Sequence, residues 1–125
     1  MCGLVGCVAF SKDHHQGIYD DVREMTSALS HRGPDSSGFW YDTNSGVALG
    51  HRRLSILDLS DAGSQPFMSS CGRWILVFNG EIYNHQSLRN SDYFRDSPVE
   101  WRGNSDTETI VALIAKIGFE RTLQN

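Results

Sequence analysis

The sequence lacks the features that mark membrane, nucleic-acid-binding and exported proteins. No apolar run approaches the roughly 20 residues needed to cross a bilayer, so we expect no membrane partner. The formal net charge is only −4, and no basic cluster predicts contact with nucleic acid. Residues 2–10 are apolar, but the stretch is short and no Lys or Arg precedes it, which argues against a secretory signal.

Cysteine is scarce, with only Cys2, Cys7 and Cys71 in the chain. An odd number at uneven spacing, without an export signal, predicts reduced thiols and a cytoplasmic location. No Cys-x-x-Cys motif is present, and the side chains of the adjacent His14 and His15 would diverge. We therefore expect no metal site.

The chain has the length and composition of one globular domain, with 125 residues of which 39% are hydrophobic. Residues 2–10 predict a buried strand. Four apolar residues at helical spacing predict an amphipathic helix from about residue 16 to residue 30. These four are Ile18, Val22, Met25 and Leu29. Residues 38–41 and 47–51 flank a polar turn and predict a hairpin.

The second half predicts one apolar strand and two helices. Residues 74–79 predict a buried strand, and residues 85–89 a short helix. Ser105 and Glu108 have the spacing of a capping box ahead of an apolar helix that Gly118 ends. Together the segments predict a layered α+β domain whose sheets are incomplete.

Cys2 is the residue that most strongly suggests chemistry. Removal of Met1 would leave Cys2 with a free α-amine, whose pKa of about 7.7–8.0 leaves it partly neutral at cellular pH. Such an amine can act as the base for its own thiol, so an N-terminal Cys needs no His or Asp partner. The alternative is a small apolar residue at the start of a strand.

Asn79 ends the predicted strand of residues 74–79, and Gly80 follows it directly. At a sheet's rim, the Asn side-chain amide and a neighbouring backbone N–H could stabilise an oxyanion, and Gly permits close approach of a carbonyl. The alternative is a type I′ turn, for which Asn-Gly is the preferred pair.

Two charged residues are candidates for binding a zwitterion. Arg53 could hold a carboxylate through two parallel hydrogen bonds, although surface arginines are more often only solvated. Asp106 could bind an ammonium group, although an acid in the first turn of a helix also complements the helix dipole.

Five blocks together carry a family resemblance. They are CGLVG (2–6), HRGPDSSG (31–38), HRRLSILD (51–58), FNGEIYN (78–84) and NSDTE (104–108). The sequence resembles the glutaminase domain of asparagine synthetases, within the class II (N-terminal-nucleophile) glutamine amidotransferases. Amidophosphoribosyltransferase and glucosamine-phosphate synthase usually have Tyr or Gln after His-Arg-Gly, where this chain has Pro34 and Asp35.

The resemblance implies that Cys2 is the nucleophile, its α-amine the base, and Asn79 with Gly80 the oxyanion hole. Arg53 would hold the glutamine α-carboxylate, and Asp106 with Glu81 the α-ammonium group. The backbone of four further residues would line the pocket: Leu54, Ser55, Ile56 and Leu57. We assign only a structural role, the shaping of a loop, to three further motif residues: His31, Arg32 and Asp35.

The resemblance also implies a fold and partners. The family fold is a four-layer α-β-β-α sandwich of antiparallel sheets, which residues 1–125 would only partly build. The synthetase domain would normally lie on the same chain, and ATP and magnesium are expected only there, so we expect no cofactor in this domain. Glutamine is the expected substrate, and a homodimer is left open.

Two alternatives stay open from the sequence. The chain could be the glutaminase domain of another class II amidotransferase, including one that amidates a surface polysaccharide. It could instead be an inactive truncated remnant, because half-built sheets would expose unpaired edges and apolar faces.

Overall fold

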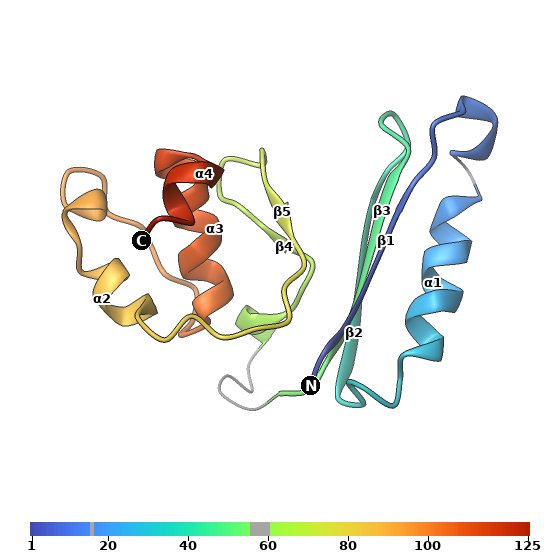
Figure 1. The fold of residues 1–125 in the computed structure, drawn as a ribbon, viewed down its shortest axis with the longest axis horizontal. Helices are drawn as coiled ribbons and strands as arrows, with labels where there is room; N and C mark the ends of the chain where they lie inside the picture. The colour runs from blue at the N-terminus through green and yellow to red at the C-terminus, as the bar shows by residue number, and fades with distance from the viewer. Residues whose placement is uncertain (16, 56–60) are drawn as a thin grey trace. The chain divides into compact units, whose positions relative to one another are not determined.

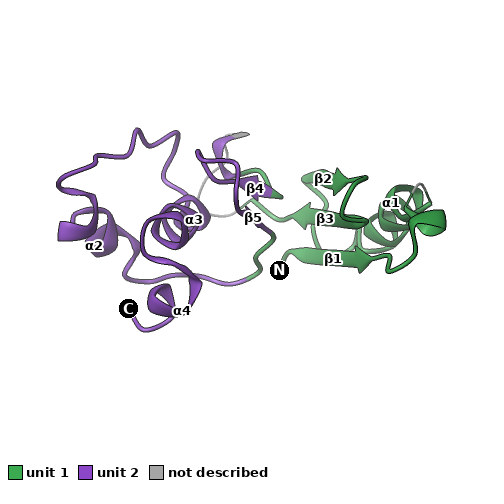
Figure 2. Ribbon diagram, turned by 90° about the horizontal axis from the view of Figure 1, so that it is seen from above, with its two compact units in different colours: residues 1–56, 64–66, 77–79 green, residues 57–63, 67–76, 80–125 purple. Residues whose placement is uncertain are grey.

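The computed structural model describes residues 1–15, 17–55 and 61–125 (Figure 1). They form two compact units (Figure 2). Unit 1 consists of residues 1–56, 64–66 and 77–79, and unit 2 of residues 57–63, 67–76 and 80–125.

Unit 1 is a three-stranded antiparallel sheet with a helix on one face (Figure 1). The strand order is β1-β3-β2, so the last of these three strands in the sequence is the central one. The strands and helices are β1 (Gly3–Val8), a 3-10 turn η1 (Lys12–His14), α1 (Ile18–Ala28), β2 (Ser36–Asp42) and β3 (Val47–Arg53). The β2–β3 pairing confirms the predicted hairpin.

The core of unit 1 lies between α1 and the sheet, and it is centred on Ile18, Val22 and Ala48. The predicted helix is present, but one of its four predicted core residues is wrong: Met25 is 42% exposed and Thr26 is fully buried. Thr26 can be buried because its hydroxyl donates to the Val22 carbonyl one turn earlier, at 2.6 Å.

β1 alternates between the two faces of the sheet and is not buried throughout. Leu4 and Val8 are 46% and 52% exposed, whereas Gly3 is buried against Leu29. The prediction of a strand was correct and the prediction of full burial was wrong. The reason is that α1 covers one face, so every second residue of β1 points the other way.

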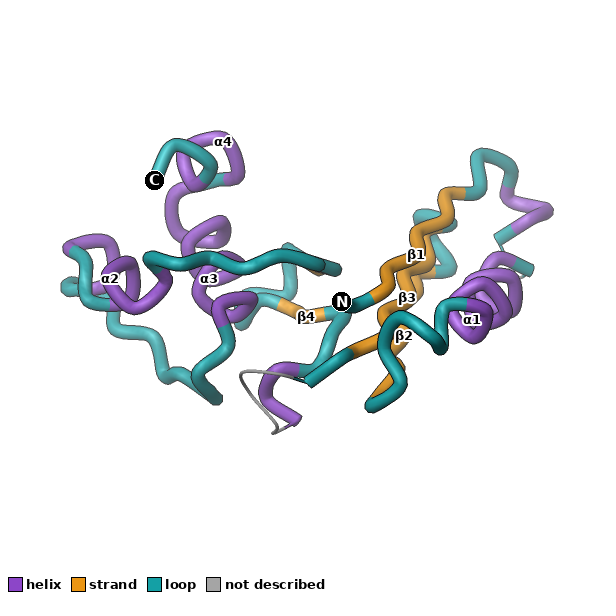
Figure 3. The backbone as a smooth tube through the Cα atoms, turned by 60° about the horizontal axis from the view of Figure 1, so that its bottom comes forward, coloured by secondary structure: helices purple, strands orange, loops and turns teal. Residues whose placement is uncertain are grey.

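Unit 2 combines a two-stranded antiparallel sheet with helices, and much of the chain around α2 is loop (Figure 3). Its elements are η2 (Asp61–Gly63), β4 (Phe67–Met68), β5 (Ile75–Leu76), α2 (His85–Arg89), η3 (Asp92–Phe94), α3 (Asp106–Ile117) and α4 (Phe119–Thr122). The buried apolar residues are Phe67, Phe94, Val111, Leu113 and Ile114. The predicted α2 and α3 are confirmed, and Gly118 ends α3 with a φ of 87°.

The predicted strand over residues 74–79 is shorter than expected. Only Ile75 and Leu76 pair with β4, and residues 74–78 are half-buried. The Phe78 N–H donates to the Gln65 side-chain oxygen at 2.6 Å. A side chain thus takes the donor that a longer strand would have used, and pairing ends before residue 77.

The fold class is α+β with antiparallel sheets, as the sequence predicted. No helix among the described residues is long and apolar enough to cross a membrane.

Candidate active site

Cys2 lies directly before β1, and the backbone of Leu54 holds its sulfur. The Leu54 N–H donates to the Cys2 Sγ at 3.4 Å, and the thiol donates to the Leu54 carbonyl at 3.8 Å. Cys2 is half-buried, and its two contacts with the Leu54 backbone orient the sulfur. The structure therefore brings together two residues that the sequence assigned to one pocket.

Arg53 is the last residue of β3 and points away from α1. Gly50 faces α1, because a Cβ there would overlap the Thr26 hydroxyl, and side chains alternate along a strand. Gly3 pairs with Arg52, so the next residues outward, Cys2 and Arg53, lie at the same end of the β1–β3 pair.

The HRGPD motif shapes the chain that leaves β3. The Asp35 carboxylate accepts a hydrogen bond from the Ser55 N–H at 2.7 Å, and the Asp35 N–H donates to the Arg53 carbonyl at 3.1 Å. A Cβ at Gly33 would overlap the Arg52–Arg53 peptide, so only glycine allows this approach. The structural role predicted for Asp35 is confirmed, and its target is the predicted pocket lining.

His51 is a buried group that the sequence reasoning did not single out. It is 1% exposed, and its Nε2 has no hydrogen-bond partner among the described residues. Burial lowers the pKa of His51, a hydrogen bond to the Phe78 backbone opposes this, and the charge of Arg53 lowers the pKa further. The imidazole is therefore held neutral. The sequence feature that could have identified His51 is its position in the same strand as the candidate Arg53, two residues before it.

Two side chains fix the backbone of Phe78, the residue before Asn79. Gln65 accepts from the Phe78 N–H, and His51 hydrogen-bonds to the Phe78 backbone. Gln65 can approach the sheet because Gly38 lies opposite its carbonyl, where a Cβ would overlap it. The exposed Asn79 side chain thus extends from a segment anchored to β3 of unit 1.

The alternative interpretation of Asn79-Gly80 as a type I′ turn is wrong. That turn requires a positive φ at both central residues. Neither Asn79 nor Gly80 has one, since the positive-φ residues of the described chain are Gly46, Gly72 and Gly118.

In unit 2, Asp106 and the residue after Glu81 are hydrogen-bonded. The Asp106 Oδ2 accepts from the Ile82 N–H at 2.9 Å, and Oδ1 accepts from the Thr107 N–H at 2.7 Å. Glu81 is exposed and Asp106 half-exposed. Because Ile82 follows Glu81, the structure brings the two predicted ammonium-binding acids close together. Asp106 also binds a backbone N–H outside its own helix, so it does more than complement the helix dipole.

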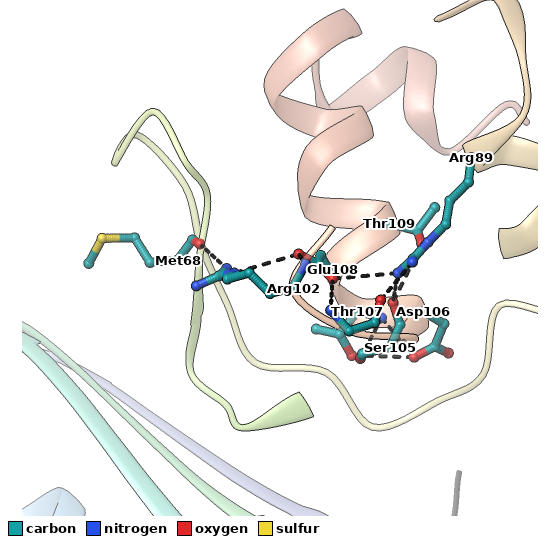
Figure 4. A network of polar contacts seen from close by, with 9 residues as sticks. Met68, Arg89, Arg102, Ser105, Asp106, Thr107, Glu108 and Thr109 are labelled. Atoms are coloured by element: carbon teal, nitrogen blue, oxygen red, sulfur yellow. Dashed lines mark hydrogen bonds and ion pairs between the residues drawn. The ribbon is translucent and has the colours of Figure 1, made fainter. Parts of the chain in front are cut away.

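The start of α3 carries a polar network (Figure 4). The Ser105 hydroxyl caps the helix, as predicted, but the N–H that it accepts from, at 3.2 Å, is that of Thr107, one residue before the Glu108 N–H of a capping box. The other half of the predicted capping box is wrong. The Glu108 carboxylate accepts from the N–H groups of Arg102 and Gly103, at 2.9 and 3.1 Å, because the preceding loop folds back over the helix.

The predicted site residues fall in both units. Cys2, Arg53, Leu54, Ser55 and Asn79 belong to unit 1, and Gly80, Glu81 and Asp106 to unit 2. Ile56 and Leu57 lie outside the described residues. Within residues 1–15, 17–55 and 61–125, no group of three or more His, Cys, Asp or Glu could hold a metal ion.

Comparison with known proteins places these features in context. A family model described as a glutamine amidotransferase domain matches residues 1–125. A putative glutamine-hydrolyzing asparagine synthetase 2 of Methanocaldococcus jannaschii is 36% identical over 136 residues, which cover 96% of this chain and 25% of that protein. The glutamine-hydrolyzing asparagine synthetase B of Escherichia coli is 37% identical over 120 residues, covering 96% and 20%.

A third relative has a different name. Amidase chry2 of Gibberella zeae is 38% identical over 103 residues, covering 81% of this chain and 15% of that protein. The chain thus spans a quarter or less of the length of these curated relatives.

Proposed function

The chain belongs to the glutamine amidotransferase domain family, and from that premise we propose that it hydrolyses glutamine to glutamate and ammonia with Cys2 as the nucleophile. The observation that carries the proposal is the family match over residues 1–125, with a cysteine at position 2 whose sulfur is oriented by the Leu54 backbone. Removal of Met1 supplies the α-amine that the mechanism needs as its base.

The reaction proceeds through a thioester. The Cys2 Sγ attacks the γ-carboxamide carbon while the thiol proton passes to the Cys2 α-amine. The side-chain amide of Asn79 and the Gly80 N–H donate to the tetrahedral oxyanion. Ammonia leaves with the proton returned by the α-ammonium group, and water then hydrolyses the γ-glutamyl thioester to glutamate and free thiol.

The other end of glutamine is held by charge. Arg53 takes the α-carboxylate, while Asp106 and Glu81 take the α-ammonium group. The backbone of residues 54–57 lines the pocket. The hydrogen bonds of Asp35 to Ser55 and of Ile82 to Asp106 support this assignment, because each orders a segment that carries proposed binding groups.

We extend the proposal to the protein that this domain serves. The two sheets belong to a four-layer α-β-β-α sandwich, of which residues 1–125 form part. A synthetase domain on the same chain uses the ammonia to make asparagine from aspartate. ATP and magnesium act in that domain, and we assign neither to residues 1–125. The names of the relatives from Methanocaldococcus jannaschii and Escherichia coli support this acceptor.

Covalent labelling tests the nucleophile. The chain is treated with diazo-oxo-norleucine, a reactive glutamine analogue, and the labelled peptide is identified by mass spectrometry. We expect one label, on Cys2 of chains that have lost Met1, and protection by excess glutamine. A label on another residue would refute the mechanism, as would glutaminase activity in chains that retain Met1.

Cys71 provides a demanding control. Its thiol is exposed, and a hydrogen bond from the Ser69 hydroxyl is the main cause that lowers its pKa. Simple thiol reactivity would therefore favour Cys71. We expect Cys71→Ser to be labelled and to hydrolyse glutamine like the wild type, whereas Cys2→Ala does neither.

A further inference from the structure

Two contacts attach the segment from Glu81 to Arg89 to the beginning of α3. At one end of the segment, the Ile82 N–H donates to the Asp106 carboxylate at 2.9 Å. At the other end, Arg89 reaches from α2 to the loop that leads into α3 (Figure 4). All of these residues belong to unit 2.

The Arg89 guanidinium is buried, and each of its three nitrogens donates a hydrogen bond. Its side chain is 8% exposed. Its Nε donates to the Thr109 hydroxyl, Nη1 to the Gly103 carbonyl and Nη2 to the Ser105 carbonyl, each at 2.7 Å. The guanidinium carbon lies 4.1 Å from the centre of the Trp101 ring.

The charge of Arg89 is retained despite burial. Burial lowers the pKa of Arg89, but the carboxylates of Glu108 and Asp106 oppose the shift. Glu108 lies 3.6 Å from Arg89 Nη2 and is itself 4% exposed. A buried charge with this many partners defines one geometry, because each lost partner would leave a buried donor unsatisfied.

The acceptors of Arg89 lie on both sides of Asp106 in the chain. Gly103 and Ser105 precede it, and Thr109 lies on the first turn of α3. The arginine therefore sets how the chain enters the helix at Asp106. Lysine would keep the charge but could not reproduce three donors in one plane.

We propose that Arg89 is a positioning residue for the α-ammonium end of the substrate. It holds Asp106 and the segment that begins at Glu81 in one arrangement, and so makes the site select amides that carry an α-ammonium group. This inference rests on the proposed function, in which Asp106 and Glu81 bind that group.

The test compares glutamine with 4-carbamoylbutanoate, which is glutamine without its α-amino group. Ammonia release by the full chain is measured for the wild type, Arg89→Lys and Arg95→Lys. Arg95 is the matched control, since its side chain is 73% exposed and forms an ion pair with the similarly exposed surface residue Asp92. We expect Arg89→Lys to lower kcat/KM for glutamine by roughly tenfold or more, mainly through KM, and to change that for 4-carbamoylbutanoate by less than about twofold.

A double-mutant cycle separates positioning from folding. In an Asp106→Asn background, Arg89→Lys should have a much smaller further effect on glutamine, because one of the two acids it positions is already changed. Equal losses on both substrates, or a full further loss in that background, would overturn the inference. If Arg89→Lys does not fold, Thr109→Val removes one acceptor with little change in shape and should shift the substrate ratio in the same direction.

Measurements on the wild type distinguish a failure of the proposed function from a failure of the inference about Arg89. A folded chain without glutamine hydrolysis would overturn the proposed function and this inference together. Hydrolysis of glutamine with no preference over 4-carbamoylbutanoate would overturn the inference and leave the Cys2 chemistry standing.

Discussion

At the scale of single residues, the orientation of Cys2 depends on Leu54, which is 52 positions away in the chain. The candidate nucleophile and the pocket lining could be proposed from the sequence, because the five blocks match a family. The contact between them could not, because it follows from the strand register that pairs Gly3 with Arg52. His51 was missed because its hydrogen-bond partner, the Phe78 backbone, belongs to a distant segment of the chain.

The proposed oxyanion hole and the proposed carboxylate site should respond differently to mutation. Asn79→Ala removes a donor that acts on the transition state, so we expect kcat to fall by roughly 10²–10³ with little change in KM. Arg53→Ala removes a contact present in ground and transition states, so we expect KM to rise with kcat nearly unchanged.

Steady-state kinetics of both variants decides between these roles. A purely raised KM for Asn79→Ala would assign Asn79 to binding. A purely lowered kcat for Arg53→Ala would remove Arg53 from the carboxylate site.

At the scale of elements, features that depend on neighbouring residues in the sequence were predicted correctly, and features that depend on distant segments were not. α3 was predicted because its cap residue Ser105, its apolar spacing and its stop at Gly118 all lie within the element. The predicted strand over residues 74–79 failed because Gln65, from another segment, takes the Phe78 N–H. Likewise Glu108 was assigned to its own helix end but caps the loop at Arg102.

The attachment of β3 to Phe78 through His51 should make unit 1 sensitive to acid. The folded pKa of His51 lies below the ordinary value of 6.5, so the unfolded chain binds more protons as the pH falls through that value. The free energy of unfolding should therefore decrease below about pH 6.5 and level off below the folded pKa. Arg53 adds to this effect, because its positive charge disfavours protonated His51.

Denaturant melts between about pH 8 and pH 5 measure this slope. We expect His51→Asn, which keeps a donor near the Nδ1 position but does not titrate, to be less stable and to show a shallower pH dependence. His14→Asn, at an exposed position, should keep the wild-type slope. Equal slopes for wild type and His51→Asn would show that His51 is not the responsible group.

At the scale of the whole molecule, the residues proposed for glutamine hydrolysis are divided between the two units. Cys2, Arg53 and Asn79 come from unit 1, and Gly80, Glu81 and Asp106 from unit 2. The family could be identified from the sequence because five motif blocks are distributed along most of the chain. The family match over residues 1–125 confirms this identification. The four-layer sandwich and the acceptor of ammonia stay predictions, since the chain spans a quarter or less of the relatives with which it was compared.

The central claim is that Cys2 becomes a nucleophile when its own α-amine is free. It is tested most directly by preparing the same chain in two forms, one beginning at Met1 and one beginning at Cys2, and measuring glutamate release from glutamine. We predict hydrolysis only by the form that begins at Cys2, with a rate that falls as the pH drops below the pKa of the α-amine, about 7.7–8.0 for an ordinary N-terminus. Equal hydrolysis by the form that retains Met1 would contradict the account.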